Sequence, residues 1–287
     1  MTAQQWVLLA VQASIILTVV SFGLTATLRD ATFLLRNPAL LIKTILSMNV
    51  AMPLVAAMIG MESDAPLAVK LALVALSVSP VPPIVQKKQV ASGGHTGYVL
   101  SLMVVMSVLA VVLVPLTIGI FDRAFGGHAE IGAIAVAKIV ASTVLIPIVG
   151  ALFVRQFFPA AAKASRAVGI LANLLLAVGV VPLLVALWPT MQPYIGNGVV
   201  LKLAMMAVIG FVVGHLLGGP DEADREVLAT STASRHPAVA ITVANAFPLA
   251  HDKEEIAVIL LYLIVAALLT GLYQKWQSRR IAGVTHG

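Results

Sequence analysis

Two short polar segments with prolines interrupt otherwise apolar stretches of this 287-residue chain. The first reads SVSPVPPIVQKK over residues 77–88, and the second reads TSTASRHP over residues 230–237. Proline removes a backbone donor and clashes with the preceding turn, so each segment predicts a helix break. The prolines expected to make these breaks are Pro80, Pro82, Pro83 and Pro237.

Arg235 and His236 are the side chains in these segments that are best suited to bind a ligand or to carry a proton. A charge near the middle of a membrane costs about 2.5–3.5 kcal/mol on insertion scales, so Arg235 is expected to have a partner or a wet cavity. The alternative is that Arg235 binds backbone carbonyls and only fixes the broken helix. His236 is the group there that titrates near neutral pH, and its alternative is an ordinary core histidine.

If the two breaks meet, their side chains form one polar site that has net positive charge and contains no carboxylate. Freed helix N-termini would add partial positive charge, so this site favours an anion. Asn49 could line the cavity or bridge two helices, and Lys87 could reach the cavity or mark the inner surface. The predicted substrate-binding residues are Asn49, Ser79, Gln86, Lys87, Ser231, Ser234, Arg235 and His236, with Ser77 beside them.

The elements that must position this site are membrane-spanning helices. The chain is 60% apolar and 10% charged, whereas a soluble domain is nearer half apolar and a quarter charged. A spanning helix needs about 20 mostly apolar residues. Nine segments qualify, roughly 6–28, 38–60, 66–86, 95–119, 131–155, 165–188, 196–218, 225–248 and 255–276. Their connections are short, so we predict one all-α transmembrane domain over residues 1–287.

The order of these spans suggests an inverted repeat. The interrupted spans are the third and the eighth, and paired interrupted helices in two halves indicate a transporter site. If the first half lacks one leading helix, the repeats are about 6–119 and 131–276, a 4+5 arrangement in which the broken helices cross. Such an arrangement predicts a secondary transporter.

The Lys and Arg residues outside the spans predict the orientation. Only Arg123 and Lys253 fall on the predicted outer side. The inner side carries Arg29, Arg36, Lys87, Lys88, Arg155, Lys163, Arg166, Arg225, Lys275, Arg279 and Arg280. The N-terminus is therefore expected outside and the C-terminus in the cytoplasm of a multi-pass cell-membrane protein.

Several other classes of function lack support in the sequence. The chain has no cysteine, no Walker A motif, no phosphate-binding glycine loop and no His/Asp/Glu cluster at metal-ligand spacing. No basic helix interleaves with aromatic residues, which argues against nucleic acid. We therefore expect neither an enzyme nor a resident cofactor or metal, and a scaffold would not require buried charge in broken helices. Residues 252–255 are predicted to be solvated loop charges.

Several short motifs resemble the bile acid:sodium symporter family. These motifs are Phe22-Gly23-Leu24-Thr25, Arg29-Asp30, Arg36-Asn37-Pro38, Met52-Pro53, Ser79-Pro80 and Ala238-Val239-Ala240. The resemblance implies a panel domain and a core domain, with two broken helices crossing in the core. It also implies nine or ten helices and sodium-coupled uptake of organic anions.

The chain departs from the family pattern where the family binds sodium. The family's Ser-Asn pair falls on Val85-Gln86, its Glu falls on Ser231, and its Gln-Asn falls on Arg235-His236. Its Ser and Thr of the next helix fall near Val99 and Met103, and its Gln of the preceding helix falls near Met48. Valine and methionine side chains cannot bind sodium, and arginine repels it.

Three modes of coupling therefore remain for a transporter of small organic anions. Fixed charge from Arg235, aided by Lys87, could replace sodium in neutralising the anion. Sodium coupling could persist with Gln86 and Ser231 as weak ligand candidates. Proton-coupled or uncoupled transport is the third mode.

Overall fold

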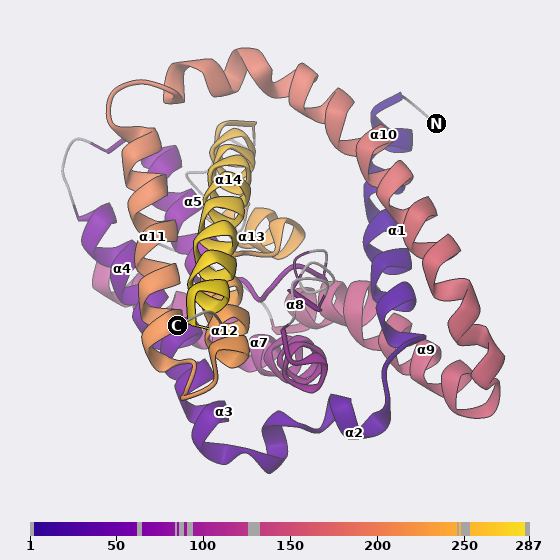
Figure 1. Ribbon diagram of the computed structural model, residues 1–287. Helices are drawn as coiled ribbons and strands as arrows, with labels where there is room; N and C mark the ends of the chain where they lie inside the picture. The colour runs from indigo at the N-terminus through magenta and orange to yellow at the C-terminus, as the bar shows by residue number, and fades with distance from the viewer. Residues whose placement is uncertain are drawn as a thin grey trace.

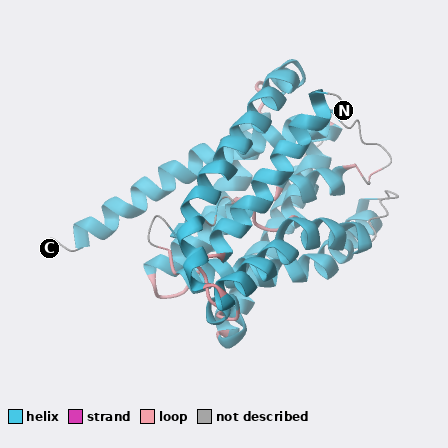
Figure 2. Ribbon diagram, turned by 90° about the vertical axis from the view of Figure 1, so that its right-hand side faces the viewer, coloured by secondary structure: helices cyan, strands magenta, loops and turns pink. Residues whose placement is uncertain are grey.

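The computed structural model describes residues 3–61, 65–83, 85, 89–90, 94–125, 133–245, 247 and 253–284. All regular structure in these residues is helical, and no strand occurs among them (Figure 2). Six helical stretches there are long and apolar enough to cross a membrane: Pro38–Gly60, Thr96–Phe121, Ile134–Phe157, Pro159–Tyr194, Val199–Leu217 and Lys253–Arg279. Two shorter apolar helices cover Leu9–Gly23 and Leu67–Val78. The prediction of an all-helical, multi-pass membrane protein is confirmed.

One group of helices packs around the N-terminal helix. α1 (Ala3–Gly23) lies along α10 (Ser165–Met191) and also contacts α9 (Ile146–Phe157), as Figure 1 shows on the right. The hydroxyls of Ser21 and Ser165 each donate to the other residue's backbone carbonyl at 2.8 Å. This reciprocal pair joins α1 to the start of α10.

The remaining helices form a second group that contains both broken spans. It comprises α3 (Pro38–Ile45), α4 (Met52–Gly60), α5 (Leu67–Val78), α7 (Thr96–Phe125), α11 (Val199–Leu217), α12 (Glu222–Ala233), α13 (Pro237–Ala244) and α14 (Lys253–Val284). A connector with α2 (Leu28–Ala31) and the 3₁₀ turn η1 (Leu34–Arg36) joins α1 to this group at the bottom of Figure 1. The two groups meet where α10 packs on α14, and where α8 (Ala133–Val140) packs on α7 and α13.

Two spans contain a wide π-helical segment just before a proline. η2 (Leu46–Ala51) joins α3 to α4 and precedes Pro53, and η3 (Ala141–Leu145) joins α8 to α9 and precedes Pro147. Proline cannot donate to the carbonyl four residues earlier and clashes with it in an α-helix. A π segment widens the turn at this point, so the helix continues through the proline.

α11 packs against α12 through a row of glycines. Gly210 and Gly214 of α11 and Gly218, which directly follows its last residue, recur every four residues along one face. A Cβ on Gly214 would lie 2.5 Å from the Ala229 Cα, and a Cβ on Gly218 would lie 2.4 Å from the Arg225 Cα. Small residues at this spacing let helix backbones approach closely in a membrane. The first half of the second broken span is held to α11 in this way.

Candidate functional site

Both interrupted spans end their first helix within four residues of a proline. α5 ends at Val78, and Ser79 is extended with φ −75° and ψ 143°. α12 ends at Ala233, Ser234 is extended, and α13 restarts at Pro237. The residue before a proline is pushed out of the helical region, and proline itself is well suited to the first helical position. Each break therefore leaves unpaired carbonyls at the C-terminal end of a 12-residue half-helix.

The guanidinium of Arg235 joins the two breaks. Its Nη1 donates to the carbonyl of Ser79 at 3.1 Å, and its Nη2 donates to the carbonyl of Thr232 at 2.8 Å. The Arg235 side chain is only 1% exposed. The positive charge of its guanidinium lies at the C-terminal ends of α5 and α12, where helix dipoles concentrate negative partial charge. Arg235 thus neutralises both half-helix ends.

The backbone of His236 also joins the two breaks, and we call the place where they meet the crossing. Its imidazole ring has no partner among the described residues. The backbone N–H of His236 donates to the carbonyl of Pro80 at 2.8 Å. Both ring nitrogens are buried, and neither has a hydrogen-bond partner among the described residues. A buried imidazole normally makes at least one hydrogen bond, so the ring of His236 keeps hydrogen-bonding capacity that the described residues do not use.

The predicted serines lie at the two breaks, but two of them use their hydroxyls within their own helix. Ser77 donates to the carbonyl of Val74 at 2.7 Å, and Ser79 donates to that of Leu76 at 2.9 Å. Ser231 and Ser234 are also buried beside Arg235. Gln86 and Lys87, the other two candidates from the first break, lie outside the described residues.

Gln89 joins the two broken spans, although its sequence context did not predict this. Its buried amide nitrogen lies 3.0 Å from the Val227 carbonyl, 2.5 Å from Thr230 Oγ1 and 2.9 Å from Ser231 Oγ. The segment after the first break is therefore bound to α12. Arg235 makes the reverse connection, from the second break to the end of α5. The only feature of the sequence that pointed to Gln89 was its place as one more polar residue after Gln86, Lys87 and Lys88.

The π segment η2 adds polar groups from a third element. Ser47 Oγ and Thr232 Oγ1 lie 2.7 Å apart and are both buried. Asn49 is half-buried on the same segment, and its Oδ1 has no partner among the described residues. η2 contacts α5, α11 and α12, so it is packed against both broken spans.

Two glutamates are buried contrary to expectation or without having been singled out in the sequence. Glu255 was predicted in a solvated loop, but it lies in the first turn of α14 and is 0% exposed. Glu226 on α12 is 5% exposed, and its Oε1 accepts from Gln274 at 3.2 Å. The expectation failed because an acidic side chain in a first helical turn is favoured by the helix dipole, so Glu255 belongs to the helix.

Tyr262 supports the crossing from α14. Its hydroxyl donates to the carbonyl of Ala233 at 2.6 Å, and the side chain is fully buried.

Tyr262→Phe leaves this carbonyl without its donor, so we expect a loss of about 1–3 kcal/mol in the free energy of unfolding. Thermal unfolding in detergent measures this loss. Tyr194→Phe, at a half-buried hydroxyl that donates to Glu254, should cost less, and equal losses would contradict the assigned role.

A family model described as the sodium bile acid symporter family matches residues 13–188. No curated protein matches the chain. The matched segment is more than half of the chain and reaches from the middle of α1 to near the end of α10, so it includes the first break and the π segment η2. The second break lies beyond it. On this match, the chain belongs to the sodium bile acid symporter family.

Proposed function

We propose that this protein is a secondary transporter of a small organic anion in which Arg235 replaces a bound sodium ion. The observation that carries the proposal is the pair of hydrogen bonds from one guanidinium to the carbonyls of Ser79 and Thr232. Carbonyls of unwound backbone and half-helix C-termini are the groups that coordinate Na⁺ in transporters with broken helices. Here a permanent cation binds them.

A fixed cation at this point would change the coupling of transport. A sodium ion binds and leaves with each cycle, whereas a guanidinium on the chain remains and is effectively always protonated. The positive charge that attracts an anionic substrate is then present without a sodium gradient. The ring of His236, which has no partner in the described part of the chain, and the N-terminus of α13 lie next to Arg235 in the chain and supply polar groups for that anion.

The architecture that we infer for this mechanism is one membrane domain of nine spans. The repeats cover about 6–119 and 131–276 with opposite topology, and the N-terminus is outside. The grouping of α1, α9 and α10 apart from the helices of the crossing supports division into a panel and a core. Rocking of one group against the other would then expose the crossing alternately to each side.

Sodium-dependent symport is the second candidate, and one group of oxygens favours it. The unpartnered Oδ1 of Asn49 and the hydroxyl of Ser231 are oxygens of the type that sodium binds. In this alternative the family's coupling is kept with new ligands, and Gln86 contributes another. Arg235 would then serve only to fasten the two breaks.

Uptake by proteoliposomes distinguishes these candidates. We expect radiolabelled small organic anions to enter at the same rate with and without an inward sodium gradient, because Arg235 already supplies the cation. A panel of mono- and dicarboxylates and bile acids identifies the substrate, and a parallel proton gradient tests proton coupling through His236. Uptake that requires sodium would reject the fixed-cation mechanism and favour sodium symport.

A further inference from the structure

The connector between α1 and α3, extended by the first turns of α3, repeats an apolar–basic pair every seven residues. The pairs are Leu28-Arg29, Leu35-Arg36 and Ile42-Lys43. Leu28, Leu35 and Ile42 are large apolar side chains, yet they are 60%, 60% and 57% exposed. Each basic partner lines a cavity in the same region. The connector thus presents apolar surface and positive charge together.

A cavity of about 450 Å³ is built around the first two basic residues. Arg36 is held in place because its Nη2 donates to the Arg29 carbonyl and its Nε donates to the Thr32 carbonyl at 3.4 Å. The structure gives the Arg29 guanidinium no hydrogen bond or ion pair among the described residues. The cavity is lined by Arg29, Asp30, Phe33, Arg36, Asn37 and His95.

His95 is the third basic side chain that lines this cavity. Its ring packs against Phe33 with centroids 4.5 Å apart. Its Nδ1 accepts the N–H of Tyr98 at 3.1 Å, so the proton of the neutral ring is on Nε2. The nearby acid is already engaged, because Asp30 Oδ2 accepts from the N–H of Thr27 at 2.9 Å and from its hydroxyl at 2.6 Å. Two guanidinium groups and one imidazole ring therefore line one cavity.

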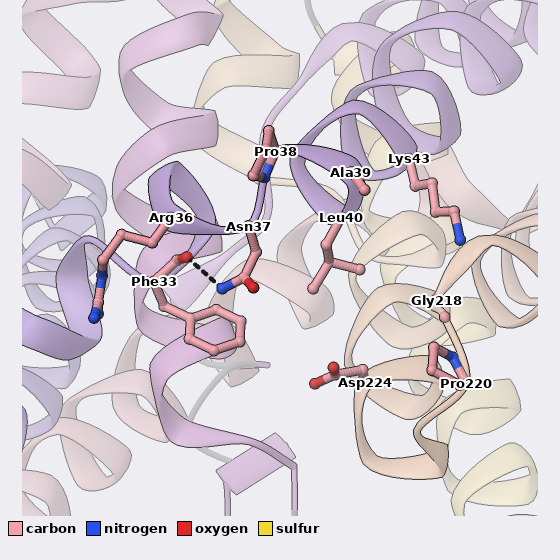
Figure 3. A pocket seen from close by; sticks show the side chains of 11 residues that line it. Phe33, Arg36, Asn37, Pro38, Ala39, Leu40, Lys43, Gly218, Pro220 and Asp224 are labelled. Carbon is pink, nitrogen blue, oxygen red and sulfur yellow. Dashed lines mark hydrogen bonds between the residues drawn. The ribbon is translucent and has the colours of Figure 1, made fainter.

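A second cavity of about 340 Å³ adjoins the first and shares Phe33, Arg36 and Asn37 with it (Figure 3). It reaches from the start of α3 to the turn between α11 and α12. Lys43 lies on one side and Asp224 on the other. Burial raises the pKa of the Asp224 carboxyl, and nearby His95 opposes this rise.

We propose that the first cavity binds the phosphate group of an anionic phospholipid, with Arg29, Arg36 and His95 as donors. Guanidinium groups bind phosphate in bidentate fashion. The exposed Leu28, Leu35 and Ile42 favour a lipid over a soluble phosphate, because an interfacial segment with apolar and basic faces lies at the boundary between acyl chains and headgroups. Because this connector joins the α1 group to α3, the bound lipid fixes its position in the membrane.

Native mass spectrometry of the detergent-purified protein tests this site, with phosphatidylglycerol and phosphatidylcholine as probes. We expect preferential binding of phosphatidylglycerol, and Arg29→Gln should weaken it about five-fold, the contribution of one basic residue near an anionic surface. This variant keeps the Arg29 carbonyl that holds Arg36. Arg166→Gln, which removes an exposed charge at the start of α10, should leave the preference unchanged.

Three results would overturn the assignment. One is equal binding of the two lipids, and another is an equal loss in Arg29→Gln and Arg166→Gln, which would mean that only general surface charge acts. The third is displacement of phosphatidylglycerol by millimolar inorganic phosphate with the same sensitivity to Arg29→Gln, which would make the ligand a soluble phosphate.

Discussion

Arg235→Ala should abolish the uptake of organic anions and also weaken the fold. The substitution removes two charge-assisted hydrogen bonds and leaves the carbonyls of Ser79 and Thr232 buried without their donor. Hydrogen bonds to charged groups contribute about 1.5–3 kcal/mol each. We therefore expect uptake to fall by about 100-fold or more, since each 1.4 kcal/mol is a factor of about ten. Proteoliposome uptake and thermal unfolding in detergent measure the two effects.

Arg235→Lys and Arg279→Ala are the matched variants for this experiment. Lysine keeps the charge but lacks the planar fork that reaches two carbonyls at once, so we expect partial activity and intermediate stability. Arg279 is exposed near the end of α14, and its loss should change neither quantity. If the Arg235→Ala variant transports normally with a sodium gradient, the guanidinium only stabilises the contact between the two breaks and does not replace sodium.

Gly214→Ala should separate α12 from α11 and destabilise the second broken span. The new methyl carbon would lie 2.5 Å from the Ala229 Cα, 2.6 Å from the Leu228 carbonyl oxygen and 2.7 Å from the Ala229 nitrogen. These are backbone atoms, so no side chain can rotate to make room. Overpacking of this kind costs about 1–3 kcal/mol or more. We expect a lower unfolding temperature and a loss of uptake, because Arg235 follows α12 directly.

Alanine substitutions at two further glycines, where the packing is less close, should destabilise the protein less. A Cβ on Gly210 would meet the Ala233 Cα at 3.0 Å, so Gly210→Ala should cost less than Gly214→Ala. Gly271 on α14 has nothing within 4 Å of its Cβ position, and Gly271→Ala should be neutral or slightly stabilising. If the unfolding temperatures of the Gly214 and Gly271 variants shift alike, close packing of α11 on α12 does not stabilise the protein.

The sequence was most informative where local backbone chemistry decides the outcome. Prolines predicted interruptions after Ser79 and before Pro237, and α5 and α12 end at Val78 and Ala233. Apolar content predicted the all-helical membrane fold. The packing role of the glycines at 210, 214 and 218 was not predicted from the sequence, and it emerged only when the structure placed α12 against them.

The chemistry of individual side chains was less readable, because it depends on which distant segments meet. Ser77 and Ser79 looked equivalent to Ser231 as ligands, yet their hydroxyls bind the preceding turn of α5. Gln89 looked like one more polar residue near a surface, and it is buried against α12. Glu255 looked solvated in a charged run, and it is enclosed at the start of α14.

By itself the sequence determined where the helices break, because proline acts on the backbone within one turn. It also determined that a charge stands at the second break, since Arg235 is fixed there by its position in the chain. Only the tertiary structure decided what that charge binds. Arg235 and Ser79 are 156 residues apart, and their hydrogen bond requires both half-helices to pack before the carbonyl and the guanidinium share one buried volume.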